Sequence, residues 1–123
     1  MTSPSQATAV LIVEDEPLVR FCAAQIVQEA GFAVIEAANA DEAIAILESR
    51  RDIRVVFTDM HMPGSMDGLR LAHAVRDRWP PIKIIVTSGR EWVGPHDLPD
   101  GGRFFAKPYD PGAIKDTLRA WAL

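Results

Sequence analysis

Short apolar runs of strand length alternate with amphipathic helical runs along the whole chain. Strands that are apolar at nearly every position are covered on both faces of a sheet. Their alternation with helices predicts an α/β fold, a doubly wound five-stranded parallel sheet with helices on both faces. The strands are expected at Ala9 to Val13, Ala33 to Ala37, Ile53 to Thr58, Ile82 to Val86 and Arg103 to Ala106.

Four segments have the apolar spacing of amphipathic helices. Asn39 and Asp110 stand where N-cap residues are expected. Glu42 follows Asn39 by three residues, as in a capping box, and Pro111 suits the first position of a helix. The predicted inward residues are Val19, Cys22, Ile26 and Ala30 for Pro17 to Ala30; Ala43, Ile46 and Leu47 for the helix after Asn39; Leu71, Ala72 and Val75 for Asp67 to Arg78; and Ile114, Leu118 and Trp121 for the last helix.

The stretch from Gly89 to Gly102 departs from this pattern. It contains Pro95, Pro99 and further glycines, which interrupt helices. A fourth helix between the last two strands is therefore expected to be short, at most about two turns, or irregular.

Composition and charge fit one domain of ordinary size. The chain has 123 residues, of which 48% are hydrophobic and 24% charged, so it can bury a core without disulfides. We expect residues 1–8 to form a flexible lead and residues 9–123 to form the domain. The net charge of −4, without clustered Lys and Arg, argues against a nucleic-acid partner.

The chain also lacks the features of membrane and exported proteins. No apolar run approaches the ~18 residues of a membrane span, and residues 1–8 lack the features of a signal peptide. The single cysteine, Cys22, is expected to be a small core residue, and its lack of an internal partner suits a reducing compartment. A cytoplasmic protein that does not bind a membrane is predicted.

Polar residues follow or end four of the five predicted strands. Glu14 and Asp15 follow the first strand and Asp59 follows the third. Thr87 follows the fourth strand and Lys107 follows the fifth. The carboxyl ends of parallel strands lie at one edge of the sheet, where ligands bind. Each residue alone would be an ordinary turn, cap or surface residue, but their coincidence predicts a site.

The chemistry of these residues favours a metal-dependent reaction of a phosphoryl group. Adjacent carboxylates repel one another unless a cation neutralises them. An all-oxygen set favours Mg²⁺, with Mn²⁺ as an alternative, over Zn²⁺. A hydroxyl and an ammonium beside the metal would bind the oxygens of a transferring phosphoryl group. Asp59 is a competent nucleophile that would form an acyl phosphate.

Four motifs in a specific order carry a resemblance to a known family. They are "VLIVEDE" with Glu14 and Asp15, "VVFTDMHMP" with Asp59, "IKIIVTSG" with Thr87 and "FFAKP" with Lys107. Over essentially its whole length, the chain resembles the receiver domain of bacterial two-component response regulators. The resemblance implies a flavodoxin-like sheet with strand order 2-1-3-4-5.

The resemblance implies a role for each matching residue. Asp59 looks like the phosphoacceptor, which takes a phosphoryl group from a phosphohistidine on a histidine kinase or histidine phosphotransfer protein. Asp15, Asp59 and the backbone carbonyl of His61 resemble direct Mg²⁺ ligands, whereas Glu14 acts mainly through water.

Three further positions resemble the family's phosphoryl-binding and switch residues. Thr87 is similar to the hydroxyl that moves to the phosphoryl group, and Lys107 to the cation that pairs with it. Phe104 falls at the switch aromatic position. The resemblance also implies a downstream protein target and allows a weak homodimer.

Three departures from the family pattern are visible in the sequence. The loop from Met62 to Gly68 is one residue longer than usual, beside the phosphoacceptor. The 20 positions from Thr87 to Lys107 are fewer than usual, and the missing length falls in the irregular fourth helix, part of the usual dimer surface. Phe104 lacks the hydroxyl on which some switches rely.

Several functions are compatible with these residues. Because the chain ends at Leu123, soon after the last helix, we expect no DNA-binding output domain. The leading expectation is a stand-alone phosphoacceptor switch, which is not an enzyme although it assists its own phosphorylation and dephosphorylation. An alternative is a receiver module of a hybrid histidine kinase. A Mg²⁺-dependent phosphohydrolase is a third possibility, but such an enzyme would need a second aspartate at the position of His61. A degenerate receiver that only binds a partner is a fourth, but the acidic pair, Asp59, Thr87 and Lys107 are all present and argue against it.

Overall fold

A computed structural model describes residues 8–64, 66–89, 94 and 96–121. The described residues form five strands and four helices, and the sheet is parallel with the order β2-β1-β3-β4-β5. The predicted α/β class and strand order are confirmed. The elements are β1 (Ala9–Val13), α1 (Pro17–Glu29), β2 (Ala33–Ala37), α2 (Ala40–Ser49), β3 (Ile53–Asp59), α3 (Gly68–Arg78), β4 (Lys83–Ser88), β5 (Arg103–Ala106) and α4 (Pro111–Ala120).

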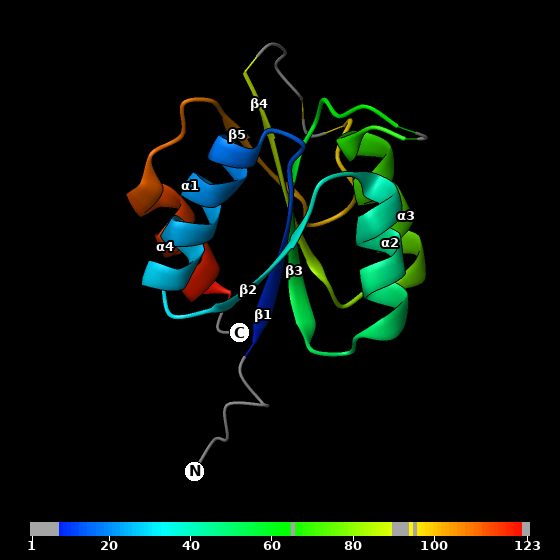
Figure 1. The fold of residues 1–123 in the computed structure, drawn as a ribbon, viewed down its shortest axis with the longest axis horizontal. Helices are drawn as coiled ribbons and strands as arrows, with labels where there is room; N and C mark the ends of the chain where they lie inside the picture. Colours follow the sequence, from blue (N-terminus) through cyan, green and yellow to red (C-terminus); the bar gives the residue numbers. More distant parts are fainter. Residues whose placement is uncertain (1–7, 65, 90–93, 95, 122–123) are drawn as a thin grey trace.

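The helices cover both faces of the sheet. Helices α1 and α4 lie on one side of the strands, and α2 and α3 lie on the other (Figure 1). Alternate residues of β1 divide between the two sides: Leu11 and Val13 join the core under α2 and α3, while Val10 and Ile12 join the core under α1 and α4. All of β1 is buried, as expected for a central strand covered twice.

Side-chain caps begin three of the helices. Asn39 accepts a hydrogen bond from the Glu42 backbone N–H at 2.9 Å, and the Glu42 carboxylate accepts one from Ala38 at 2.9 Å. Asp110 caps α4 through the Gly112 N–H, and Asp67 caps α3. The caps predicted at Asn39 and Asp110 are therefore confirmed. Such caps satisfy backbone donors that a helix leaves unpaired at its start.

The predicted inward stripe of α1 is wrong in part. Cys22 is exposed, and the helix buries Ala23, Ala24 and Val27 instead. The cause is the distribution of apolar residues around most of α1, so that spacing alone does not choose the inward side. Small alanines face the core, which allows the helix to lie close to the sheet.

Strand β4 begins one residue later and extends further than predicted. The Ile82 backbone N–H donates to the Trp79 carbonyl at 3.0 Å, so Ile82 belongs to the turn that precedes the strand, although it is buried. The strand continues through Thr87 and Ser88, which are also buried. Strand β3 likewise includes Asp59.

The segment between β4 and β5 forms turns where it is described, at residues 94 and 96–102. It packs against α3, because His73 contacts the Asp97 carbonyl at 2.8 Å and Arg76 donates to the Asp100 carbonyl at 2.9 Å. The remainder of the predicted short or irregular helix, at 90–93 and 95, lies outside the described residues. Residues 1–7 of the predicted lead do so as well.

The four helices in the described part of the chain have 10–13 residues each. No helix there combines the length and the apolar character that crossing a membrane requires.

Candidate functional site

A cleft of about 650 Å³ lies at the carboxyl end of the sheet. The β1–α1 connection, the end of β3 with the loop after it, and the residues after β4 and β5 form its walls. Five of the residues expected to form a site line this cleft, whereas Thr87 does not. Its lining residues are Glu14, Asp15, Glu16, Val19, Asp59, His61, Met62, Pro63, Asp67, Gly89 and Lys107.

Three carboxylates gather in the cleft. One oxygen from each of Glu14, Asp15 and Asp59 lies within 4.8 Å of the others. Glu14 and Asp59 are buried, and Asp15 is exposed to solvent. Hard divalent cations such as Mg²⁺ prefer oxygen ligands and retain waters, so a set with one solvent-facing carboxylate fits Mg²⁺. The donor chemistry of these residues therefore fits the predicted metal.

Lys107 bridges two of the carboxylates. Its Nζ lies 3.0 Å from Glu14 Oε1 and 2.9 Å from Asp59 Oδ1. The Lys107–Pro108 peptide is cis, and the Lys107 N–H donates to the Ser88 carbonyl at 2.9 Å. Burial lowers the pKa of Lys107, but the hydrogen bonds to Asp59 and Glu14 outweigh it, so the pKa lies above its ordinary value. The cleft therefore contains a fixed cation at neutral pH.

Thr87 and Phe104 are not among the residues that line the cleft. Thr87 pairs with Asp59 in the register of β3 and β4, and 1% of its surface is exposed. Phe104, on β5, pairs with Val86 and packs against the core under α2 and α3. Thr87 is thus adjacent to the predicted phosphoacceptor and is not one of the residues that line the cleft. His61 does line the cleft.

Backbone contacts fix the position of Asp59 and the residue after it. The Met60 N–H donates to the Thr87 carbonyl at 2.8 Å, and the Gly68 N–H donates to the Met60 carbonyl at 2.8 Å. A Cβ built on Gly68 would lie 1.7 Å from the Asp59 carbonyl oxygen. The first turn of α3 therefore lies directly against the end of β3, at a position that only glycine fits.

Three features in or beside the cleft were not predicted from the sequence. Asp67 lines it while capping α3, and the second aspartate of "TDMHMPGSMDG" was the available signal. Arg20 donates to the Glu14 carbonyl at 2.8 Å and pairs with Glu36 at 3.1 Å. The Glu14–Lys107 ion pair was not expected, because the lysine was predicted to pair only with a phosphoryl group.

Replacing Glu14 with glutamine is expected to raise the free energy of unfolding of the metal-free protein at pH 7, because the buried carboxylate is charged there. Burial raises the pKa of Glu14 above the ordinary value of 4.5, although Lys107 opposes this, so ionised Glu14 is disfavoured in the folded state. The loss in free energy of unfolding caused by ionised Glu14 reaches its full size at pH values above the folded-state pKa. It disappears as the pH falls below 4.5, where Glu14 is protonated in both the folded and the unfolded state. Urea unfolding in EDTA should therefore show a gain at pH 7 that fades near about pH 4.

Glu16→Gln is the matched control for this measurement. Glu16 is exposed in the same connection, so its neutralisation should change the free energy of unfolding by less than about 0.5 kcal/mol. A Glu14→Gln protein less stable than wild type at pH 7 would show instead that the ion pair with Lys107 outweighs the burial of the carboxylate.

Comparison with known proteins places this fold and cleft in a family. The family model described as "Response regulator receiver domain" matches residues 10–119. Sensor kinase CckA of Brucella abortus is 34% identical over 122 residues, which cover 96% of this chain and 13% of that protein. The chain therefore spans about an eighth of the length of this curated relative.

Solved structures agree with this match. The receiver domain of hybrid histidine kinase CckA superposes with a TM-score of 0.76 at 30% identity, covering 94% of this chain and 99% of that one. Response regulator TrrA of Thermotoga maritima, solved in complex with Mg²⁺-BeF, has a TM-score of 0.78 at 26% identity, covering 92% and 97%. The chain belongs to the response regulator receiver domain family.

Proposed function

We propose that the protein is a phosphoacceptor switch in which Asp59 receives a phosphoryl group from a phosphohistidine in a Mg²⁺-dependent reaction. The observation that carries this proposal is the Lys107 ammonium 2.9 Å from Asp59, in a cleft that also contains Glu14 and Asp15. A nucleophile, a fixed cation and a metal-binding set are the parts that phosphoryl transfer requires.

Asp15 and Asp59 would bind the metal directly, with the backbone carbonyl of His61 as a third ligand and Glu14 acting through water. When bound, Mg²⁺ neutralises negative charge on the phosphoryl oxygens and on the carboxylates. The similarity to TrrA, whose structure is a complex with Mg²⁺-BeF, supports this assignment. The three carboxylates of Glu14, Asp15 and Asp59, with one oxygen of each within 4.8 Å of the others, support it independently.

The chain's own residues supply the rest of the chemistry. An Asp59 carboxylate oxygen attacks phosphorus, the new O–P bond forms as the P–N bond to the donor histidine breaks, and the imidazole leaves with that electron pair. Lys107 then pairs with a phosphoryl oxygen, and the Thr87 hydroxyl donates to another. The product is an acyl phosphate on Asp59.

The switch is expected to act through β4 and β5. Thr87 is buried beside Asp59, so it has to move to reach a phosphoryl oxygen, and Phe104 lies on the next strand, paired with Val86. Movement of Thr87 would change the space in which the Phe104 ring packs. This coupling does not need the aromatic hydroxyl that Phe104 lacks. A downstream protein that contacts this edge of the sheet would bind with a different affinity after the change.

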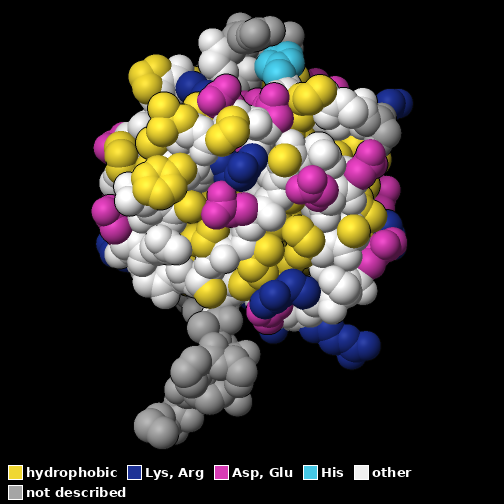
Figure 2. Space-filling view, in the orientation of Figure 1, with side chains coloured by type: hydrophobic (Ala, Val, Ile, Leu, Met, Phe, Trp, Pro, Cys, Tyr) yellow, Lys and Arg dark blue, Asp and Glu magenta, His cyan; other side chains and the backbone are white. Residues whose placement is uncertain are grey.

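An exposed apolar surface beside the cleft suits a protein donor. Leu18 and Phe21 of α1 are 68% and 55% exposed, and Val19 between them lines the cleft. In Figure 2 hydrophobic side chains gather on the left of the view, over α1. This surface supports a histidine kinase or a histidine phosphotransfer protein as the phosphoryl donor, since large apolar side chains dominate protein interfaces.

A receiver module of a hybrid histidine kinase is the second candidate. It is favoured by the 34% identity to Brucella abortus CckA and by the similarity to a hybrid kinase receiver. In that setting the same Asp59 chemistry would pass a phosphoryl group between domains of a longer protein.

The proposal is tested with a small phosphodonor. Wild-type protein is incubated with acetyl phosphate and Mg²⁺, and intact mass is followed for one added phosphoryl group. We expect the adduct with Mg²⁺ and none with excess EDTA, because the carboxylates repel an incoming anion when no cation neutralises them. Absence of an adduct with Mg²⁺, or equal adduct in EDTA, would contradict the proposed function.

A further inference from the structure

A second cavity, of about 680 Å³, lies at the end of the sheet opposite the Asp59 cleft. The end of α2, the start of β3 and the turn between α3 and β4 enclose it. We call it the arginine pocket. Its volume lies within the range of small-molecule sites, roughly 300–1,000 Å³. The lining residues are Leu47, Glu48, Arg50, Arg51, Ile53, Arg54, Arg78, Trp79, Pro80, Pro81 and Ile82.

The inner part of the arginine pocket is apolar. Leu47, Ile53 and Ile82 are almost fully buried and belong to the core under α2 and α3. The adjacent prolines, Pro80 and Pro81, are exposed and add rigid apolar surface at its margin. Transfer of an apolar ring or short chain from water to this part of the pocket is favourable, because it buries apolar surface and breaks no hydrogen bond of the ligand.

Two of the four arginines already have carboxylate partners. Arg50 makes a bidentate pair with Asp52, at 2.7 and 3.0 Å, and Arg78 pairs with Glu48 at 2.7 Å. Arg78 also covers the ring of Trp79, with its guanidinium carbon 4.4 Å from the ring centre. These two arginines therefore have structural roles at the ends of α2 and α3.

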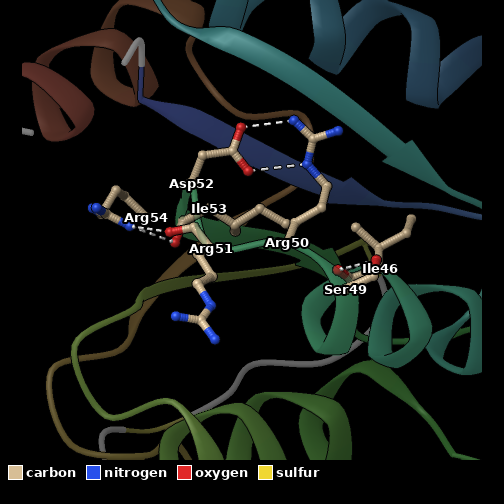
Figure 3. A network of polar contacts seen from close by, with 7 residues as sticks. All are labelled: Ile46, Ser49, Arg50, Arg51, Asp52, Ile53 and Arg54. Atoms are coloured by element: carbon tan, nitrogen blue, oxygen red, sulfur yellow. Dashed lines mark hydrogen bonds and ion pairs between the residues drawn. The ribbon is translucent and has the colours of Figure 1, made fainter. Parts of the chain in front are cut away.

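The other two arginines make no hydrogen bond or ion pair with a carboxylate of the described residues, although the charge of Arg54 acts on nearby Asp52. Arg54 donates only to the backbone carbonyls of Arg51 and Ile53. The Arg51 guanidinium has no hydrogen bond or ion pair to a described residue. In Figure 3 the Arg51 side chain extends to the opposite side of the backbone from the Arg50–Asp52 pair.

This concentration of positive charge contrasts with the rest of the molecule. The whole chain has a net charge of −4, and the expectation that its Lys and Arg do not cluster is wrong at this end. Figure 2 shows Lys and Arg side chains at the lower end of the molecule, where β3 begins. Guanidinium groups bind carboxylate and phosphate oxygens through paired N–H donors. Arg51 and Arg54 have such donors available.

We propose that the arginine pocket binds a small organic anion, a molecule with one aromatic ring or short apolar chain and one carboxylate or phosphate group. The apolar part lies against Leu47, Ile53 and the two prolines. The anionic group pairs with Arg51 and Arg54. The site is at the opposite end of the sheet from Asp59, so it is a second binding function and not part of phosphoryl transfer.

The test uses phenylphosphonate, which has both features and a phosphorus that cannot be transferred. Isotope-labelled, metal-free protein is titrated in EDTA and followed by amide NMR spectra. We expect saturable shifts confined to residues 47–54 and 78–82. Methylphosphonate, which lacks the ring, and benzyl alcohol, which lacks the charge, should each bind at least about tenfold more weakly.

Variants test whether Arg51 and Arg54 bind the anionic group of the ligand. The double variant Arg51→Gln/Arg54→Gln should bind phenylphosphonate at least about tenfold more weakly. Arg119→Gln, at an exposed position of α4 on the other side of the sheet, should bind as wild type does. All variants should accept a phosphoryl group on Asp59 as wild type does, which verifies that they fold.

Four results would overturn the inference. They are the absence of saturable shifts at these residues, equal affinity in the double variant, methylphosphonate binding as tightly as phenylphosphonate, and binding of an acidic peptide at these residues without binding of phenylphosphonate. The last result would assign the surface to a protein partner instead.

Discussion

Replacing Asp59 with asparagine is expected to abolish phosphoryl transfer to the protein. After incubation with acetyl phosphate and Mg²⁺, intact mass should show no phosphoryl adduct, whereas wild type acquires one. An amide oxygen is a poor nucleophile and cannot form the acyl phosphate. The asparagine oxygen can still accept a hydrogen bond from Lys107, which lies 2.9 Å from Asp59 Oδ1, so the cleft should keep its shape.

Asp67→Asn is the matched control. Asp67 lines the same cleft and caps α3 by accepting a hydrogen bond from the Arg70 N–H at 2.8 Å. Asparagine caps helices as well as aspartate does, so this variant should fold normally and acquire the adduct. Equal adduct in Asp59→Asn and wild type would show that another side chain is the acceptor. Loss of the adduct in both variants would show that negative charge in the cleft, and not one nucleophile, limits the reaction.

The sequence was sufficient for the fold because its strands are short apolar runs between polar turns. The predicted bounds of β1, β2 and β5 are confirmed to the residue. Ile82 was misassigned to β4 because an apolar residue next to a strand looks the same whether it pairs in the sheet or packs in the preceding turn. Its N–H bonds to Trp79, a local contact that composition does not reveal.

Helix α1 marks the limit of periodicity as a guide. Apolar residues such as Leu18, Phe21 and Cys22 lie on its exposed side, while Ala23 and Val27 face the core. Where both sides of a helix are apolar, spacing cannot identify the buried one. Two of these exposed apolar residues, Leu18 and Phe21, are those that we assign to the contact with a phosphoryl donor.

The convergence of the site residues was predictable, but their pairing was not. Parallel strand order alone brings Glu14, Asp59 and Lys107 to one edge of the sheet. Whether Lys107 contacts one carboxylate or both depends on side-chain orientation, and the structure has it contact both. The arginine pocket escaped prediction for a similar reason, because Arg51 and Arg78 are distant in the sequence and meet only in the folded chain.

Gly68→Ala is expected to lower the free energy of unfolding by about 3 kcal/mol. The added Cβ would lie 1.7 Å from the Asp59 carbonyl oxygen, 2.7 Å from its carbonyl carbon and 3.0 Å from the Met60 Cα. All three atoms belong to the backbone, so no side-chain rotation relieves the clash. Either the first turn of α3 or the Asp59–Met60 peptide has to move, and urea unfolding measures the cost.

The same displacement should slow phosphoryl transfer, on the order of a hundredfold if the Asp59 carboxylate moves by about 1 Å. Gly112→Ala is the control, since its Cβ would approach only the Asp110 carboxylate, at ordinary distances of 3.5–3.9 Å. Because Gly112 lies in the first turn of α4, alanine there should leave stability unchanged or raise it by about 0.5–1 kcal/mol. If Gly68→Ala is instead as stable and as readily phosphorylated as wild type, α3 shifts freely relative to β3. The close approach of Gly68 would then not fix the position of Asp59.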